Sequence, residues 1–338
     1  MKKRRLGKSG LVVSEICMGT MTFGDQTDES MAHLIMDTAL DHGVNFFDIA
    51  EMYPVPPKAE TFGVTEEIVG RWAKDKPRES IILATKITGA GHGWFIPPVR
   101  HGMTTLDRHQ IVRAVEGSLN RLQTDYIDLY QTHWPDHGMP HDETLAAMTE
   151  LKQAGNETCW GVMKSLWTSE LSGLERLETV QNNFSLINRR CESELAQVCR
   201  REQVSLLPYS PLAGGVLCGK YNNGAFPEGA RFSHYMIHGK ERQKNMARRF
   251  VNERTLAVVD RVQTIARDAG MHPVTLATAW TKQHDYVAST IIGASHVDQL
   301  EDTLRAGGVV LDEEIMAKIE QIESDIPNPM PEDGLRRL

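Results

Sequence analysis

The stretch ELKQAGNETCWGVMKSLWTSE, residues 150–170, decides how many strands the fold contains. It reads as the end of one helix followed almost at once by a second helix, with no obvious strand between them. The rest of the chain alternates short apolar runs with helical periods, which is typical of strand–helix units and a parallel sheet. The number of strands therefore determines which α/β architecture the sequence predicts.

Seven segments have the apolar, β-branched or aromatic composition of buried strands. They are EICMGT (15–20), NFFDIA (45–50), SIILATKI (80–87), YIDLYQTH (126–133), ETVQNNF (178–184), VSLLPYS (204–210) and ASTIIGA (288–294). Helical stretches such as 30–43 and 107–123 lie between them and place their apolar residues on one face. The opening RRLGKSGLVV, residues 4–13, predicts a β-hairpin. Seven strands are one fewer than a (β/α)8 barrel requires.

A doubly wound nucleotide-binding sheet would also accommodate this pattern, so the two architectures must be distinguished. That sheet needs a glycine fingerprint at its first strand-to-helix turn, and MGTMTFGDQ, residues 18–26, does not have one. Polar residues gather instead at the C-terminal ends of separate strands, where barrel enzymes keep their chemistry. These residues are Asp48, Lys86, His133, Gln181 and Tyr209. The sequence therefore predicts an α/β protein with a (β/α)8 TIM barrel.

The composition indicates which binding partners the protein is not expected to recognise and in which cellular compartment it is expected. The chain has 338 residues and a net charge of -8, which argues against nucleic acid or an anionic membrane as the main partner. Its five cysteines are scattered and form no CxxC pair, as in proteins of a reducing cytosol. No apolar run reaches the ~20 residues of a membrane helix. We expect a cytoplasmic protein that does not bind a membrane.

Three histidines spaced four residues apart raise the question of a metal site. They are His133, His137 and His141, and Pro135, Gly138 and Pro140 lie between them. The prolines and the glycine prevent a helix that would place the three imidazoles on one face. We therefore expect no metal.

Seven motifs in a fixed order resemble the aldo-keto reductase family over nearly the whole chain. They are GTMTFG, FFDIAEMY, ATK, LYQTHWPD, VQNNFSLINR, PYSPLAGGVLCGKY and IIGASHVDQLED, and YPVPP resembles one bacterial branch. The resemblance implies a single barrel domain over residues 1–338, with an N-terminal β-hairpin and a long cofactor loop. It also implies reduction of a small aldehyde or ketone to an alcohol by direct hydride transfer, with NADPH favoured over NADH as cofactor. The oligomeric state is not indicated.

Carried over residue by residue, the family's catalytic tetrad falls on Asp48, Tyr53, Lys86 and His133. Carbonyl reduction needs a proton for the oxygen, and Tyr53 is the expected general acid. An ammonium ~4 Å from the phenol at an effective dielectric of ~20 is worth ~4 kcal/mol, and Lys86 would supply it. Asp48 would keep Lys86 charged, and His133 would orient the carbonyl oxygen. Taken singly, Asp48 also fits a helix cap and Tyr53 fits loop packing before Pro54.

The resemblance places the nicotinamide on Tyr209, with Gln181 at its carboxamide and the 212–217 backbone at the pyrophosphate. The expected cofactor contacts are Gly19, Thr20, Asn156, Gln181, Tyr209, Ser210, Leu212, Gly214, Leu217, Lys220, Gly293, Ser295, Gln299 and Thr303. GASHVDQLEDT, residues 293–303, matches the adenosine-phosphate site at the start of a helix. Ser295 stands where many members carry a cationic residue, and Thr303 where asparagine is common. The segment 211–246 is long enough to form a lid over the cofactor.

Two alignments with the family remain open for residues 150–170. In the first, Cys159–Met163 is the fifth strand, and Met163-Lys164 replaces a Ser-Asn pair that grips the carboxamide. In the second, Asn156 belongs to an Asn-Glu-Thr motif after that strand, Thr158–Glu170 is a helix, and a strand is missing before Asn156. The second is preferred, because Asn-Glu-Thr-x-Trp-Gly is the more specific match.

A barrel that has lost an interior strand exposes unpaired strand edges, so the second alignment predicts instability or weak cofactor binding. The alternative function that follows is a catalytically weak, cofactor-binding regulatory or structural subunit on the same barrel.

Overall fold

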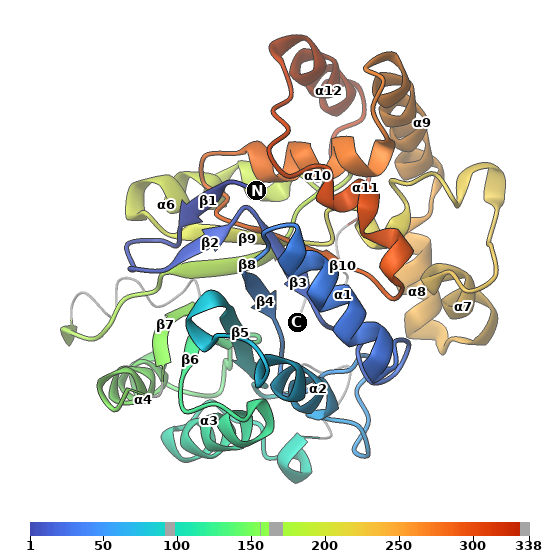
Figure 1. The fold of residues 1–338 in the computed structure, drawn as a ribbon. Helices are drawn as coiled ribbons and strands as arrows, with labels where there is room; N and C mark the ends of the chain where they lie inside the picture. The colour runs from blue at the N-terminus through green and yellow to red at the C-terminus, as the bar shows by residue number, and fades with distance from the viewer. Residues whose placement is uncertain (92–98, 156, 162–171, 332–338) are drawn as a thin grey trace.

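Eight parallel strands curl into a barrel at the centre of the molecule, and helices surround them (Figure 1). The computed structural model describes residues 1–91, 99–155, 157–161 and 172–331. The strands are β3 (Ile16–Gly19), β4 (Phe46–Asp48), β5 (Ile82–Ile87), β6 (Ile127–Thr132), β7 (Glu157–Gly161), β8 (Thr179–Asn183), β9 (Ser205–Tyr209) and β10 (Thr290–Gly293). The first of them, β3, pairs with the last, β10, and β7 lies next to β8, so the strands form a ring. All seven predicted strands and the (β/α)8 barrel are confirmed.

Strand β7 corrects the prediction for residues 150–170. Glu157–Gly161 pairs in parallel with β6, so the helix predicted to start at Thr158 and the strand predicted to be missing are both wrong. Asn156 and residues 162–171 lie outside the described part of the chain. The physical reason is that the backbone groups of β6 need a partner on this side. That pairing outweighs the local helical spacing of apolar residues on which the prediction rested.

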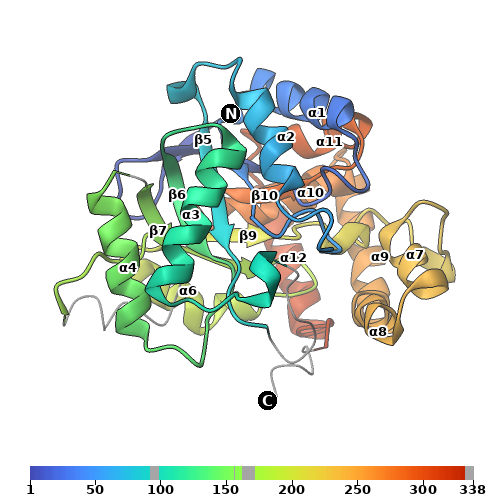
Figure 2. The same cartoon turned by 90° about the horizontal axis from the view of Figure 1, so that it is seen from below.

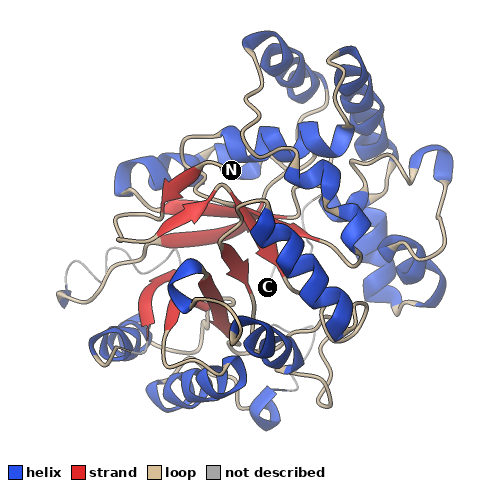
Figure 3. Cartoon of the chain, in the orientation of Figure 1, coloured by secondary structure: helices blue, strands red, loops and turns tan. Residues whose placement is uncertain are grey.

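The helices lie outside the strands (Figures 2 and 3). They are α1 (Glu29–Asp41), α2 (Val64–Ala73), α3 (Arg108–Leu122), α4 (His141–Gln153), α6 (Glu194–Glu202), α7 (Arg231–His238), α8 (Glu241–Phe250), α9 (Glu253–Asp268), α10 (Pro273–Gln283), α11 (Glu301–Leu304) and α12 (Glu313–Asp325). Local sequence explains the bounds of α1, because the Asp28 side chain caps its start by accepting from the Met31 amide. Gly43 follows its end with a left-handed φ of 85°. No helix in the described ranges combines the length and the apolar composition needed to cross a bilayer.

The predicted N-terminal hairpin closes one end of the barrel. Strands β1 (Lys3–Arg5) and β2 (Val12–Ser14) pair antiparallel, and Leu6 and Val13 are buried with the apolar side chains inside the barrel. Next to β2 in the sequence, the buried Glu15 carboxylate forms an ion pair with the buried Lys282 ammonium, with Oε2 and Nζ 3.0 Å apart. This packing fills the N-terminal end of the strands and leaves the opposite rim for chemistry.

The predicted long loop after β9 is largely folded. Its backbone forms the short turns η5 (Ala213–Gly215) and η6 (Asn222–Gly224), and then α7 and α8 pack together at the edge of the molecule (Figures 1 and 2). Phe232 of α7 stacks on Phe250 of α8 with ring centroids 5.1 Å apart. Aromatic packing therefore holds most of this segment in a defined position.

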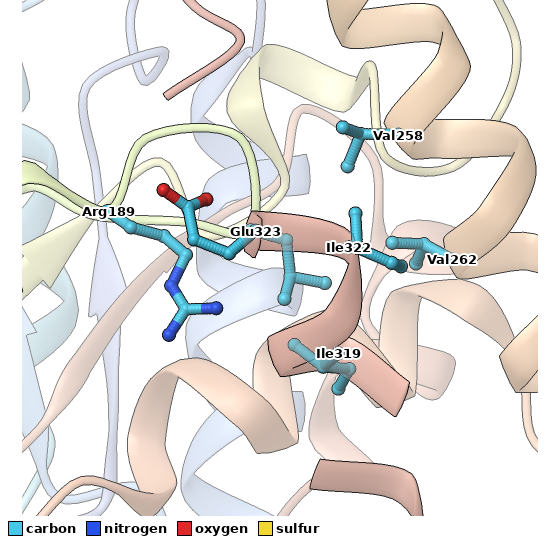
Figure 4. A pocket seen from close by; sticks show the side chains of 7 residues that line it. Arg189, Val258, Val262, Ile319, Ile322 and Glu323 are labelled. Carbon is cyan, nitrogen blue, oxygen red and sulfur yellow. The ribbon is translucent and has the colours of Figure 1, made fainter. Parts of the chain in front are cut away.

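Helix α12 packs on α9 through a narrow apolar seam. Figure 4 shows Val258 and Val262 of α9 facing Ile319 and Ile322 of α12, with Arg189 at one side. The seam leaves no space for a water molecule. It is a contact between helices rather than a ligand site.

Candidate active site

The barrel registers bring the C-terminal ends of the strands to one rim. Gly293 of β10 lies opposite Gly19 of β3, and Gly19 lies opposite Asp48 of β4. Lys86 of β5 lies opposite Gln131 of β6. A side chain at Gly19 would come within 2.9 Å of the Ile292 carbonyl, so glycine is needed where β3 meets β10. Residues far apart in the sequence thus meet at the end of the barrel that the hairpin leaves open.

Asp48 and Lys86 form a buried ion pair at the centre of this rim. Lys86 Nζ donates to Asp48 Oδ1 at 2.5 Å and to the Ile49 carbonyl at 2.6 Å, and both side chains are less than 5% exposed. Burial alone would lower the pKa of Lys86, but Asp48 and Tyr53 raise it above its ordinary value. Lys86 is therefore a fixed cation at neutral pH.

Tyr53 lies beside both this cation and His133. The Lys86 ammonium is 4.9 Å from the centroid of the Tyr53 ring. The rings of Tyr53 and His133 meet edge to face, with centroids 5.6 Å apart. The structure thus brings all four predicted tetrad residues together.

The pKa of Tyr53 is shifted upwards, whereas the positive charge of Lys86 alone would shift it downwards. Burial raises the pKa of Tyr53, Lys86 lowers it, and Asp48 raises it again. The net result is a pKa above the ordinary value of a tyrosine. The phenol therefore keeps its proton at neutral pH, as a general acid must before the reaction.

Two glutamines join the tetrad inside the barrel. Gln181 Nε2 donates to Asp48 Oδ2 at 2.6 Å and to Gln131 Oε1 at 3.2 Å, and Gln131 Nε2 donates to Asp48 Oδ2 at 3.3 Å. Gln181 was predicted as a cofactor contact, and the structure shows that its amide also holds Asp48. Sequence reasoning missed Gln131. Its signal is a polar residue two positions before His133, which faces the same side of the strand.

Several predicted cofactor contacts lie on the rim, with different degrees of access. Tyr209 ends β9 and is 42% exposed, whereas Thr20 is fully buried and donates its hydroxyl to the Asp48 carbonyl at 2.9 Å. Leu217 is also fully buried, so its side chain packs in the core. Lys220 folds back over the turn after Leu212. Its Nζ lies so close to Gly215 that a Cβ at this glycine would come within 2.7 Å of it.

The end of β10 differs in detail from the predicted helix start. The 3-10 turn η7 (Val297–Gln299) comes first, and the four-residue helix α11 follows it. The Ser295 amide donates to Gln299 Oε1 at 3.0 Å, so these two predicted contacts hold each other. Thr303 is 4% exposed and donates its hydroxyl to the Gln299 carbonyl at 3.1 Å. The expected contact from Asn156 lies outside the described residues.

Two further observations concern Trp134 and the possibility of a metal site at the rim. Trp134 donates its indole N–H to the Ala90 carbonyl at 2.6 Å, and its ring lies 4.9 Å from that of His133. Among the described residues, no group of three His, Cys, Asp or Glu side chains is placed to hold a metal ion.

The tetrad side chains lie at the C-terminal rim of an eight-stranded parallel α/β barrel, the end at which barrel enzymes carry their active sites. The chain belongs to the aldo/keto reductase family, whose model matches residues 15–324.

The relatives share most of their length with this chain. Protein tas of Escherichia coli (strain K12) is 40% identical over 363 aligned positions, which cover 98% of this chain and all of that protein. The uncharacterized oxidoreductase YrpG of Bacillus subtilis (strain 168) is 33% identical, over 95% of this chain and 96% of its own. A probable voltage-gated potassium channel subunit beta of Arabidopsis thaliana is 34% identical, over 97% and 98%.

The match with protein tas also contains positions that this chain does not fill. Because 98% of 338 residues is about 331, about 30 of the 363 aligned positions have no residue of this chain. This chain is therefore shorter than that relative in one or more segments within the matched region.

Proposed function

We propose that the protein is an NADPH-dependent carbonyl reductase in which Tyr53 protonates the substrate oxygen. The observation that carries this proposal is the buried Asp48–Lys86 pair, whose ammonium lies 4.9 Å from the Tyr53 ring centroid. A cation in that position stabilises the phenolate that forms as Tyr53 gives up its proton. An aldehyde or ketone of small size is the proposed substrate.

Each residue of the tetrad has a separate task in this proposal. Tyr53 holds the proton until the carbonyl oxygen gains negative charge, because burial keeps its pKa high. Lys86 offsets the charge left on Tyr53, and Asp48 keeps Lys86 in place through the 2.5 Å contact. His133, next to the Tyr53 ring, hydrogen-bonds the substrate oxygen and orients it. The bound nicotinamide supplies the hydride.

The residues around the rim fit a nicotinamide dinucleotide. Tyr209 offers an accessible ring at the end of β9, on which a nicotinamide can stack. The amide nitrogen of Gln181 is committed to Asp48, which leaves its oxygen to accept from the carboxamide. Backbone from Ser210 to Gly215 contains left-handed residues with φ between 51° and 90°, a conformation that forms anion-binding concavities. Lys220 lies over Gly215 and adds a positive charge for the pyrophosphate.

The remaining proposed contacts lie where the strands end. Their sites are Gly19, Thr20, Leu212, Gly214, Leu217, Gly293, Ser295, Gln299 and Thr303. Buried Thr20, Leu217 and Thr303 act through their backbone or by holding a neighbour rather than through an exposed side chain. The Ser295–Gln299 pair lies at the proposed adenosine end.

The test is the Tyr53→Phe variant, assayed with NADPH and an aromatic aldehyde. Loss of the general acid should lower kcat by roughly 10²- to 10⁴-fold. NADPH affinity, measured by quenching of protein fluorescence, should stay within about twofold, since the ring and its packing remain. Reduction of the aldehyde by this variant at nearly the wild-type rate would show that Tyr53 is not the proton donor.

A second candidate function is a cofactor-binding subunit with little catalysis. Two observations favour it: a relative named as a potassium channel subunit beta is 34% identical, and about 30 positions matched in protein tas are absent here. Sustained turnover of generic aldehydes by the wild-type chain would exclude this alternative. Tight NADPH binding without turnover would favour it over the reductase.

A further inference from the structure

A second buried ion pair, between Glu51 and Arg100, lies beside the tetrad and takes no part in the chemistry above. Glu51 is 1% exposed, and both of its carboxylate oxygens accept from Arg100 Nη1. The amide of Thr88 also donates to Glu51 Oε1, at 2.5 Å. Three hydrogen bonds therefore converge on one carboxylate inside the protein.

The backbone at Glu51 connects the two segments that carry Tyr53 and Lys86. The Glu51 amide donates to the Lys86 carbonyl at 3.2 Å, and the Tyr53 amide donates to the Ala50 carbonyl at 3.0 Å. Because the Glu51 side chain also binds the backbone at Thr88, Glu51 joins the loop after β4 to the end of β5 at two points, the Lys86 carbonyl and the Thr88 amide.

Arg100 extends the join to a third segment. Its Nη2 donates to the Thr88 carbonyl at 3.1 Å, and its Nε donates to Gln110 Oε1 at 3.1 Å at the start of α3. Arg100 and His101 have φ values of 48° and 56°, a left-handed backbone that is unfavourable for residues other than glycine. The contacts of the guanidinium hold the backbone in this conformation.

A buried carboxylate in this place needs its partner. Burial raises the pKa of Glu51, while Arg100 and the Thr88 amide oppose that rise. Removing Arg100 leaves the Glu51 carboxylate without its counter-charge. It also removes the hydrogen bonds by which Arg100 connects Glu51, Thr88 and Gln110.

We infer that Glu51 and Arg100 are positioning residues, whose ion pair sets the distance between the Tyr53 phenol and the Lys86 ammonium and thereby controls kcat. The inference rests on the proposed reductase function. Neither residue is assigned to substrate or cofactor. A misplacement of about 1 Å costs on the order of 10²-fold in rate, so small shifts of Tyr53 should be visible in kcat.

Arg100→Met in the full chain tests the inference, and Arg78→Met is the matched control. Arg78 also pairs with a largely buried carboxylate, that of Asp128 at 2.6 Å, but it precedes β5 at the opposite end of the barrel. Both variants should lose thermal stability. Only Arg100→Met should lower kcat for aldehyde reduction, by roughly 10- to 100-fold, with the Kd for NADPH within about twofold.

The isotope effect gives a readout that a loss of stability does not move. With NADPH deuterated at the transferred position, the effect on kcat should increase in Arg100→Met, because hydride transfer becomes slower than product release. It should stay unchanged in Arg78→Met. Equal kcat in wild type and Arg100→Met, or equal kcat losses in the two variants, would overturn the inference.

Two further results separate the possible failures. If Arg100→Met does not fold, Glu51→Gln with Arg100→Met replaces it, since this double variant buries no unpaired charge. The same fall in kcat is expected, and a wild-type kcat in the double variant would overturn the inference. A wild-type chain that binds NADPH but reduces no aldehyde would overturn the proposed function and the inference together, whereas loss of the inference alone leaves wild-type turnover intact.

Discussion

Replacing Lys86 by methionine should slow carbonyl reduction without abolishing cofactor binding. The change removes a buried positive charge 4.9 Å from the centroid of the Tyr53 ring. Two unit charges roughly 4–5 Å apart at an effective dielectric of about 20 interact by about 3–4 kcal/mol. The charge on Tyr53 develops only as its proton leaves, so most of this energy belongs to the transition state. We expect kcat to fall by about two orders of magnitude.

The variant must be separated from a simple loss of stability. Lys86→Met alone leaves the Asp48 carboxylate buried without its ion-pair partner, which costs roughly 3–5 kcal/mol of folding free energy. The control is therefore Asp48→Asn with Lys86→Met, in which no buried charge remains. We expect this double variant to unfold at a higher temperature than Lys86→Met and to stay as slow.

Single-turnover kinetics measure the step that matters. NADPH bound to the enzyme is mixed with an excess of aromatic aldehyde, and the loss of reduced nicotinamide absorbance gives the rate of hydride transfer. Cofactor affinity is measured separately by fluorescence. A double variant that transfers hydride within about threefold of the wild-type rate would refute the electrostatic role of Lys86.

Two more predictions concern stability away from the site. Lys282→Met leaves Glu15 buried without its 3.0 Å partner and should lower the free energy of unfolding in urea by about 3–5 kcal/mol, while Glu15→Gln with Lys282→Met should recover part of that loss. Burial, helped by Arg189, lowers the pKa of His284 to about 4, although Glu192 lies 3.9 Å away. The unfolded chain therefore takes up this proton first as the pH falls below about 6.5, and stability should drop by about 3 kcal/mol by pH 4. His284→Phe should flatten this part of the curve of unfolding free energy against pH, and an unchanged curve would contradict the burial argument.

The strands that could be predicted from sequence are those whose composition is already that of a strand. The strand-like composition of β5 and β6 is visible in the sequence itself. In the structure every residue of both strands is buried. β7 has the sequence ETCWG and lies within a stretch of helical spacing. What makes it a strand is its pairing with β6, which begins 30 residues earlier. Local propensity cannot contain that pairing.

The tetrad could be predicted because each member lies at or shortly after the C-terminal end of a strand and belongs to a family motif. The roles of Gln131 and Arg100 could not be predicted, since they depend on contacts across 83 residues to Asp48 and across 49 residues to Glu51. The pKa of Tyr53 shows the same limit, because its direction depends on burial, and burial is a property of the folded barrel.

The hairpin that fills the floor of the barrel has a consequence for the order in which the chain can fold. Its Gly7 and Lys8 amides donate to Ser205 Oγ and Glu178 Oε2, across 198 and 170 residues of chain. The segment next to it is fixed by a contact between Glu15 and Lys282, across 267 residues. A ribosome makes these N-terminal residues before most others, yet their binding partners are made late. During synthesis the hairpin therefore cannot form these contacts at once. It can close the N-terminal end of the barrel only after most of the strands have been translated.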